Sequence, residues 1–172
     1  MTERPTFERR VELDAIDNGE IHVAAPTAAE RTAIADWLGL EALDAIEGSF
    51  TFSRVQGGVI VRLDLAATAK RICVVSLEPM TEEIRETIEI QFDKDFADAA
   101  DNEVEDERLR EAWPEDGLDL AALLIDHLAL SLSPHPRKSD ASTLVETFGG
   151  QTLSSPFDKL RELVDGKTKP AS

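Results

Sequence analysis

The sequence predicts an α+β fold, in which an antiparallel meander sheet is covered by one buried helix and flanked by short helices. A partly open barrel is the alternative form of the sheet. Two patterns carry this prediction. Apolar side chains alternate with polar ones over 59–69 and again over 84–92, and such alternation buries one face of a strand. Leucine recurs every fourth residue from 120 to 128, which is typical of a helix with one buried face.

The stretch 71–79 joins the two alternating segments and must therefore hold the reversal of a β-hairpin, with Pro79 ending the turn. Only an odd register, in which paired residue numbers sum to an odd value, sets apolar opposite apolar. We expect the register that pairs Leu65 with Ile88. It also brings together Arg71 and Glu82, Lys70 and Glu83, and, unfavourably, Asp64 and Glu89. Cys73 then shares the face of Leu65, which predicts a buried, inert thiol.

The chain before this hairpin predicts a strand pair and a helix. Short strands at 8–14 and 21–23 flank Asn18-Gly19, a strong turn signal. Thr27-Ala-Ala-Glu30 fits a capping box, so a helix begins there and lies on the surface of the sheet. Gly39, the usual residue just past a helix end, stops it.

The sheet is expected to contain three long meandering strands, at about 41–54, 58–73 and 80–93. The first has mixed helical and strand spacing, with an irregularity near Gly48, and the turn at 56–58 leads into the second.

Residues 93–116 are rich in Asp and Glu, which predicts a mobile acidic loop because dense like charge repels itself. A cation site is the alternative, but the spacing lacks the glycine-centred calcium-loop pattern.

The buried helix is predicted over 116–132, with Asp116 or Asp119 as its cap and two prolines after its end. A short helix is expected to begin at Pro156-Phe157. We expect one domain over 1–165 and a disordered tail over 166–172.

The composition restricts the classes of function. The 172 residues include 35 acidic and 18 basic ones, and the net charge of −17 disfavours non-specific binding to phosphate backbones. One cysteine excludes an internal disulfide and a cysteine-cluster metal site. The first residues lack the apolar core of a signal peptide, and no run of about eighteen apolar residues could span a membrane. We expect a cytoplasmic protein without membrane contact.

The sequence gives little support for an enzyme. It has no G-x-S-x-G, no phosphate-binding glycine loop and no H-E-x-x-H. The histidines His22, His127 and His135 are scattered, and adjacent Asp126 and His127 cannot face each other on a helix. His127 is therefore expected on a polar face or hydrogen-bonded. We expect no catalytic residue, metal, cofactor or small-molecule substrate.

Three blocks of sequence point to a family. Cys73-Val-Val-Ser-Leu-Glu-Pro79, between two strands, resembles the signature of the YceD family, the large ribosomal RNA subunit accumulation proteins. The helix from Asp119 with its exit Pro134-His-Pro-Arg137, and the block Pro156-Phe157-x-x-Leu-x-x-Leu, resemble two further family blocks in the same order. Ser76 stands where many members have a second cysteine, so the motif cannot bind zinc through a cysteine pair here.

The resemblance implies a non-enzymatic role in large-subunit rRNA accumulation and ribosome assembly, with rRNA or a pre-ribosomal particle as the partner. The candidate contact residues are Lys70, Arg71, Cys73, Ser76, Leu77, Glu78, Pro79, Pro134, His135, Pro136, Arg137, Pro156 and Phe157. Direct RNA binding would use Lys70, Arg71, Arg137 and Lys138, which converge only if the helix exit lies beside the hairpin turn. The alternative is an acidic adapter that binds a basic ribosomal protein or assembly factor without touching RNA. An ordinary solvated surface and a well-formed turn remain alternatives for these residues.

Overall fold

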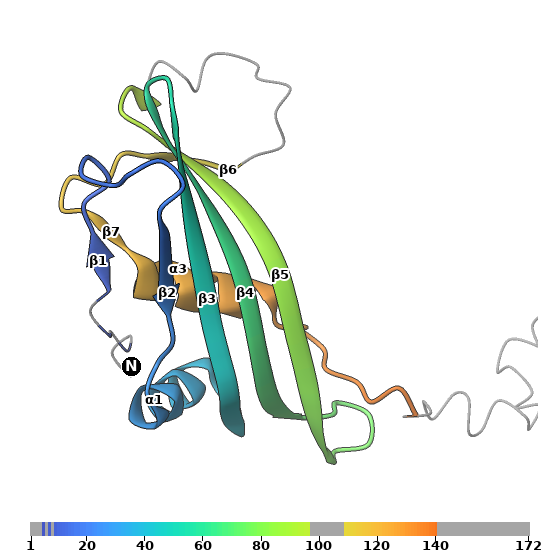
Figure 1. Ribbon diagram of the computed structural model, residues 1–172. Coiled ribbons are helices and arrows are strands. Elements are labelled where there is room, and N and C mark those ends of the chain that lie inside the picture. Colours follow the sequence, from blue (N-terminus) through green and yellow to red (C-terminus); the bar gives the residue numbers. More distant parts are fainter. Residues whose placement is uncertain (1–4, 6, 8, 97–108, 141–172) are drawn as a thin grey trace, which may run out of the picture.

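The computed structural model describes residues 5, 7, 9–96 and 109–140, and an open five-stranded sheet lies at its centre (Figure 1). The strands are β2 (Ile21–Ala24), β3 (Ala42–Val55), β4 (Gly58–Ile72), β5 (Pro79–Asp93) and β6 (Leu109–Ala112), in the order β2-β3-β4-β5-β6. The first four form an antiparallel meander, and β6 runs parallel to β5. Because β2 and β6 are the edges among the described strands, no barrel closes.

The three long strands confirm the alternating pattern to within about a residue of the expected ends. All six apolar side chains at odd positions of β4 are buried, namely Val59, Val61, Leu63, Leu65, Ala67 and Ala69. In β5, Ile84, Ile90 and Phe92 are buried on the same side of the sheet, and Ile88 is half-buried. One face of this hairpin therefore supplies much of the core.

The β4–β5 register is odd, as expected, but the expected pairing is wrong by two residues. Leu63, rather than Leu65, lies opposite Ile88. Asp64 lies opposite Thr87, whose hydroxyl donates to Asp64 Oδ1 at 2.7 Å, so the like-charge pair with Glu89 is avoided. Arg71 faces Met80, Lys70 faces Thr81, and neither of the expected charge pairs is a direct cross-strand pair.

The expected hairpin across Asn18-Gly19 does not form. Strand β1 (Arg10–Val11) pairs with β7 (Leu118–Asp119), and β2 pairs with β3. Gly19 N–H donates to the Phe52 carbonyl, and Asn18 Oδ1 accepts from Arg54 N–H. The turn residues therefore dock the loop onto the end of β3, because that long strand offers more partners than the short segment at β1.

Helix α1 (Ala28–Leu38) has the expected capping box and ends at Gly39 in the left-handed region, with φ 66°. It packs on β3, whose register shift lies between Leu43 and Ala45 rather than at Gly48. Gly48 has a different role, since a Cβ there would lie 2.7 Å from Leu124 Cδ1. The glycine lets the second helix approach the sheet closely.

That helix is α3 (Leu120–Ser131), which crosses one face of the sheet (Figure 1). Asp119 caps it by accepting from Ala121 and Ala122 N–H. The helix begins later than expected because 118–119 form β7. Its buried residues are Leu120, Ala121, Leu123, Leu124, Ile125, His127 and Leu128. His127 is only 8% exposed, so its expected place on a polar face is wrong.

The acidic region 93–116 contains strand β6, which its composition did not predict. Buried Asp93 explains the strand, since it binds Arg110 of β6 at 2.7 Å and its carbonyl accepts from Trp113 N–H. Residues 97–108 of the expected acidic loop, the helix expected to begin at Pro156-Phe157 and the tail at 166–172 lie outside the described residues. No helix in the part that the structure describes is long and apolar enough to cross a membrane.

Candidate partner-contact site at the hairpin tip

The turn between β4 and β5, residues 73–78, is here named the hairpin tip. Cys73 N–H donates to the Glu78 carbonyl at 2.9 Å, and Leu77 N–H donates to the Cys73 carbonyl at 2.9 Å. Ser76 N–H points at Cys73 Sγ, 3.4 Å away. Leu77 has φ 57°, which makes it the one non-glycine residue with positive φ in the described chain. These bonds hold the tip in one conformation even though it contains no glycine.

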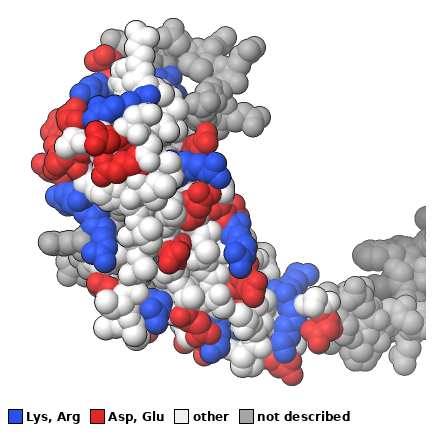
Figure 2. All heavy atoms as spheres, in the orientation of Figure 1, with Lys and Arg blue, Asp and Glu red and all other residues white. Residues whose placement is uncertain are grey.

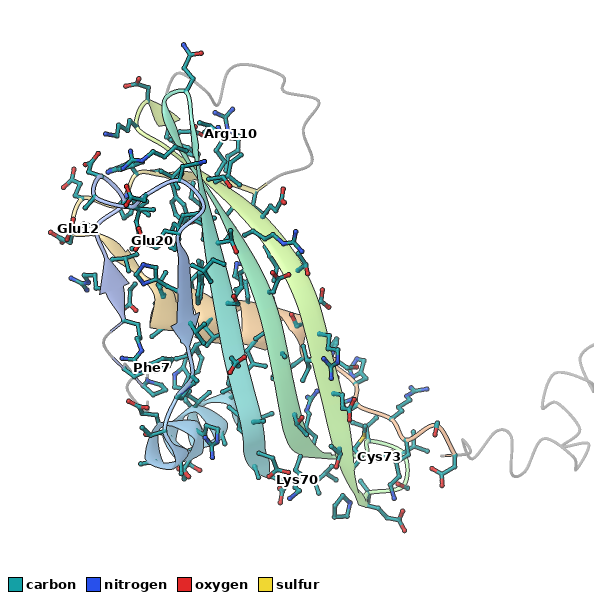
Figure 3. All side chains as sticks on the ribbon, viewed as in Figure 1. Phe7, Glu12, Glu20, Lys70, Cys73 and Arg110 are labelled. Carbon is teal, nitrogen blue, oxygen red and sulfur yellow. The ribbon has the colours of Figure 1, made fainter. Side chains whose placement is uncertain are left out.

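The exit segment, residues 133–138 after α3, lies directly against the tip. Val74 N–H donates to the Pro136 carbonyl at 2.9 Å, and Lys138 N–H points at Cys73 Sγ at 3.4 Å. Lys138 Nζ binds Glu78 Oε2 at 2.6 Å. Figure 3 shows the segment passing beside Cys73 at this end of the hairpin. The helix exit and the hairpin turn thus lie side by side, which is the condition stated above for the four basic residues to converge.

Arg71 of β4 and Glu82 of β5 bind the start of the exit segment to the two strands that lead into the tip. The Arg71 guanidinium donates to Glu82 Oε2 at 2.8 Å and to the Ser133 carbonyl at 2.6 Å, and Ser133 N–H donates to Glu82 Oε1 at 3.0 Å. Both charged side chains are about four-fifths buried, with 18% and 17% exposed. Arg71 is therefore a structural anchor, and its guanidinium is not free to bind a phosphate.

Cys73 lies at the junction of the tip and the exit segment. Its side chain is buried, as expected, and its sulfur accepts from both sides of the junction. The Ser76 side chain, followed by the N–H groups of Ser76 and Lys138, lowers the pKa of the thiol to about 6. The sulfur thus connects two segments of the chain. Among the described residues, no three His, Cys, Asp or Glu side chains are grouped as metal ligands.

A shallow groove of about 720 Å³ runs beside the junction. Its lining residues are Lys70, Pro79, Met80, Thr81, Arg137, Lys138, Ser139 and Asp140. Lys70 Nζ binds Asp44 at 3.0 Å, and the bond to Glu78 raises the pKa of Lys138. Arg137 is exposed and makes no ion pair with any residue that the structure describes. The basic residues converge here as expected, but most of their charge is already balanced.

The wider surface has the same mixed character. Figure 2 shows Lys and Arg side chains interspersed with Asp and Glu on the visible face, rather than gathered into one basic patch. Recognition of a phosphate backbone depends on a surplus of unpaired cations. This face does not provide such a surplus.

The exposed apolar cluster at the tip was not predicted from the sequence, although Leu77 was a candidate contact residue through the family resemblance. Leu77 is 74% exposed, Val74 is 47% exposed and Ile72, just before the tip, is 36% exposed. Strand alternation contained the signal for Val74, because an inward Cys73 requires its neighbour to point outward. Nothing local in the sequence marks Leu77.

The other candidate residues divide into three groups. Ser76, Glu78, Pro79, Pro134 and His135 are exposed at or near the tip, and Pro136 is buried against it. Pro156 and Phe157 lie outside the described residues. Two of the three sequence blocks therefore meet in one site.

Comparison with known families fits this arrangement. A family model described as "Large ribosomal RNA subunit accumulation protein YceD" matches residues 61–164, more than half of the chain. The chain belongs to the YceD family. The matched region begins in β4 and includes the hairpin tip, α3 and the exit segment, so the site lies within the part that the YceD family shares. Searches of curated proteins and of solved structures gave no match.

Proposed function

We propose that this YceD-family chain is a cytoplasmic, non-enzymatic factor that supports accumulation of large-subunit rRNA, and thereby ribosome assembly. It does so by binding a pre-ribosomal particle through the hairpin tip and the exit segment. One observation carries the proposal. Two sequence blocks within the region that matches the YceD family lie about sixty residues apart and form one exposed site. Hydrogen bonds between Arg71 and Ser133, 62 residues apart, and between Lys138 and Cys73, 65 residues apart, hold them together.

The chemistry of the site supports binding rather than catalysis. A cysteine nucleophile needs a base within hydrogen-bond reach and access to substrate. Cys73 is buried, and its sulfur contacts backbone N–H groups of Ser76 and Lys138. The exposed residues around it are apolar side chains and ion pairs, which are typical of a contact surface.

A second candidate is the acidic adapter, which would hold a basic ribosomal protein or assembly factor without touching RNA. The net charge of −17 and the internal pairing of Lys70, Arg71 and Lys138 favour it. An acidic surface speeds encounter with a basic protein, and such binding weakens as salt rises.

The test is a pull-down of the tagged full-length chain from growing cells, with half of each sample treated with ribonuclease. We expect large-subunit rRNA and its ribosomal proteins in the untreated half. Proteins that disappear after nuclease place the contact on RNA, and a basic protein that survives nuclease and is released by salt supports the adapter. Absence of both large-subunit rRNA and ribosomal proteins would overturn the proposal.

A further inference from the structure

We propose that Leu77 is an apolar knob that inserts into a pocket on a protein component of the particle, while Arg137 meets a carboxylate at the rim of that pocket. This inference rests on the proposed function and names the class of partner at the same site. It specifies a protein contact that is mainly apolar, which differs from both phosphate binding and the acidic adapter.

The first support is the concentration of exposed apolar side chains. Ile72, Val74 and Leu77 lie within six residues, and they make up three of the seven large apolar side chains that are exposed in the described chain. Single exposed apolar residues are normal on a protein surface, whereas a cluster on a protruding turn marks an interaction site. Of these three residues, Leu77 is the most exposed, with 74% of its surface accessible.

The second support is the backbone of Leu77. At φ 57° a leucine is strained, and glycine would adopt this conformation without strain. The strain persists because hydrogen bonds to Cys73 and from Val74 to Pro136 fix the turn on both sides. A strained and rigid contact residue binds with little loss of conformational freedom. The site thus keeps a leucine where folding alone favours glycine.

The third support is the chemistry that the site lacks for RNA. Proteins read single-stranded RNA by stacking bases on aromatic rings or on arginine planes, and they hold its backbone with free cations. Residues 70–82 and 133–140 contain no Phe, Tyr or Trp, and the imidazole of His135 is the one aromatic ring among them. Lys70, Arg71 and Lys138 are each bound to a carboxylate, so among the described residues of these two segments Arg137 is the one basic side chain without an ion pair.

The charge of Arg137 indicates which chemical group lies at the edge of the partner's pocket. Arg137 is exposed between Pro136, which binds Val74, and Lys138, which binds Cys73 and Glu78. A guanidinium that has no ion pair among the described residues and lies beside an apolar knob fits a pocket with a carboxylate at its edge, because arginine binds carboxylates with two parallel hydrogen bonds. Arginine is among the residues that are enriched at the hot spots of protein interfaces.

The experiment measures co-sedimentation of the purified full-length chain with large-subunit precursor particles, at low and high salt. We expect Leu77→Ala to weaken binding by about tenfold or more at both salt concentrations. Arg137→Ala should weaken it mainly at low salt. Leu130→Ala is the matched control, because Leu130 is 78% exposed on α3, and it should bind like the wild type.

Two further measurements identify the partner and exclude misfolding. Leu77→Gly should bind as weakly as Leu77→Ala while its melting temperature stays equal to or above that of the wild type. A photo-crosslinker introduced at position 77 should label a ribosomal protein or assembly factor in the particle, identified by mass spectrometry. Labelling of RNA or of residues 141–172 of the same chain would overturn the inference, as would wild-type binding by Leu77→Ala.

The outcomes separate the inference from the proposed function. If the wild-type chain does not sediment with the particles, both are wrong. If it does and the Leu77 variants bind equally well, the proposed function stands and the apolar knob is wrong.

Discussion

The two turns at the ends of β4 both reverse the chain between antiparallel strands, but they do so with different lengths and different residues. The β3–β4 turn uses two residues, Gln56 and Gly57, and the glycine takes the positive φ of 82°. The β4–β5 turn uses six residues and places the positive φ on a leucine. A Cβ on Gly57 would meet no atom within 4 Å, so the side-chain position of this residue faces open solvent. The hairpin tip is instead covered on one side by the exit segment.

This contrast separates a turn that only reverses the chain from one that presents a surface. The first is built from the residue with the least strain. The second keeps a strained, exposed leucine and depends on contacts from a distant segment to stay ordered. Strained backbone held in place by surrounding contacts is a feature of functional sites. The predictions below test each part of this difference, from the largest expected effect on stability to the smallest.

Glu82→Ala should have the largest effect, because it removes the carboxylate that balances the mostly buried Arg71 charge and accepts from Ser133 N–H. We expect a loss of about 2–3 kcal/mol in the free energy of unfolding, measured by urea denaturation. Glu83→Ala is the control, since Glu83 is exposed and its removal should change stability by less than about 0.5 kcal/mol. Equal effects of the two variants would mean that the anchor does not stabilise the tip.

Cys73→Ala should lower stability in a pH-dependent way. The folded thiol has a pKa of about 6 against a usual value of 9.0, so the unfolded chain binds more protons between these values. The wild-type free energy of unfolding should therefore gain a contribution that rises from about pH 6, is complete above about pH 9 and is absent below pH 6. The contribution should be missing from Cys73→Ala.

Urea denaturation of both proteins across this pH range checks the prediction. Parallel pH profiles for the wild type and Cys73→Ala would show that the thiol keeps its ordinary pKa in the folded chain. The hydrogen bonds from Ser76 and Lys138 would then stabilise the neutral thiol alone.

Reciprocal exchanges at the two turns should change stability in opposite directions. Gly57→Ala should cost about 1 kcal/mol, because the only penalty is the positive φ. Leu77→Gly should raise stability by about 0.5 kcal/mol, since the relief of strain slightly exceeds the extra freedom that glycine gives the unfolded chain. Thermal denaturation measures both. A destabilised Leu77→Gly would mean that the Leu77 side chain contributes to folding, and the contrast between the turns would weaken.

Lys70→Ala should have the smallest effect on stability, within about 0.5 kcal/mol, because its ion pair with Asp44 is about half exposed. The same variant also tests whether Lys70 contacts the particle. If Lys70 serves only the surface pair, particle binding will equal that of the wild type in co-sedimentation. A marked loss of binding would assign Lys70 to phosphate recognition.

The sequence predicted the long strands, the caps of α1 and the buried face of β4, and it gave Asp119 as one of two candidate caps of α3, because alternation, capping boxes and helix spacing are local patterns. It did not predict the partner of β1 or the existence of β6. Strands of two to four residues have no usable periodicity, and their pairing depends on distant segments. The expected register erred by two residues because opposite charges were matched directly across the strands, whereas Arg71 reaches Glu82 on a diagonal.

The candidate site shows the same division. Its residues followed from the family resemblance, and their convergence was stated only as a condition. Whether the exit segment reaches the tip depends on where α3 begins and how it crosses the sheet, which Asp119 and Gly48 determine together. The ion pair of Arg71 with Glu82 was expected, whereas the partners of Lys70 and Lys138 were not, because Asp44 and Glu78 approach them only after folding.

The sequence separation of the contacts that complete the tip has a consequence for synthesis. The β4–β5 hairpin is local and can form once 93 residues have been made, but Lys138 must still reach Cys73, 65 residues away. During translation the turn, with its own internal hydrogen bonds, therefore exists before the bonds from the exit segment. The contact surface matures only when α3 and the segment after it have left the ribosome. A chain that stalls before residue 138 would have its hairpin but would lack a finished surface, so an incomplete copy would not compete with complete ones for the same partner.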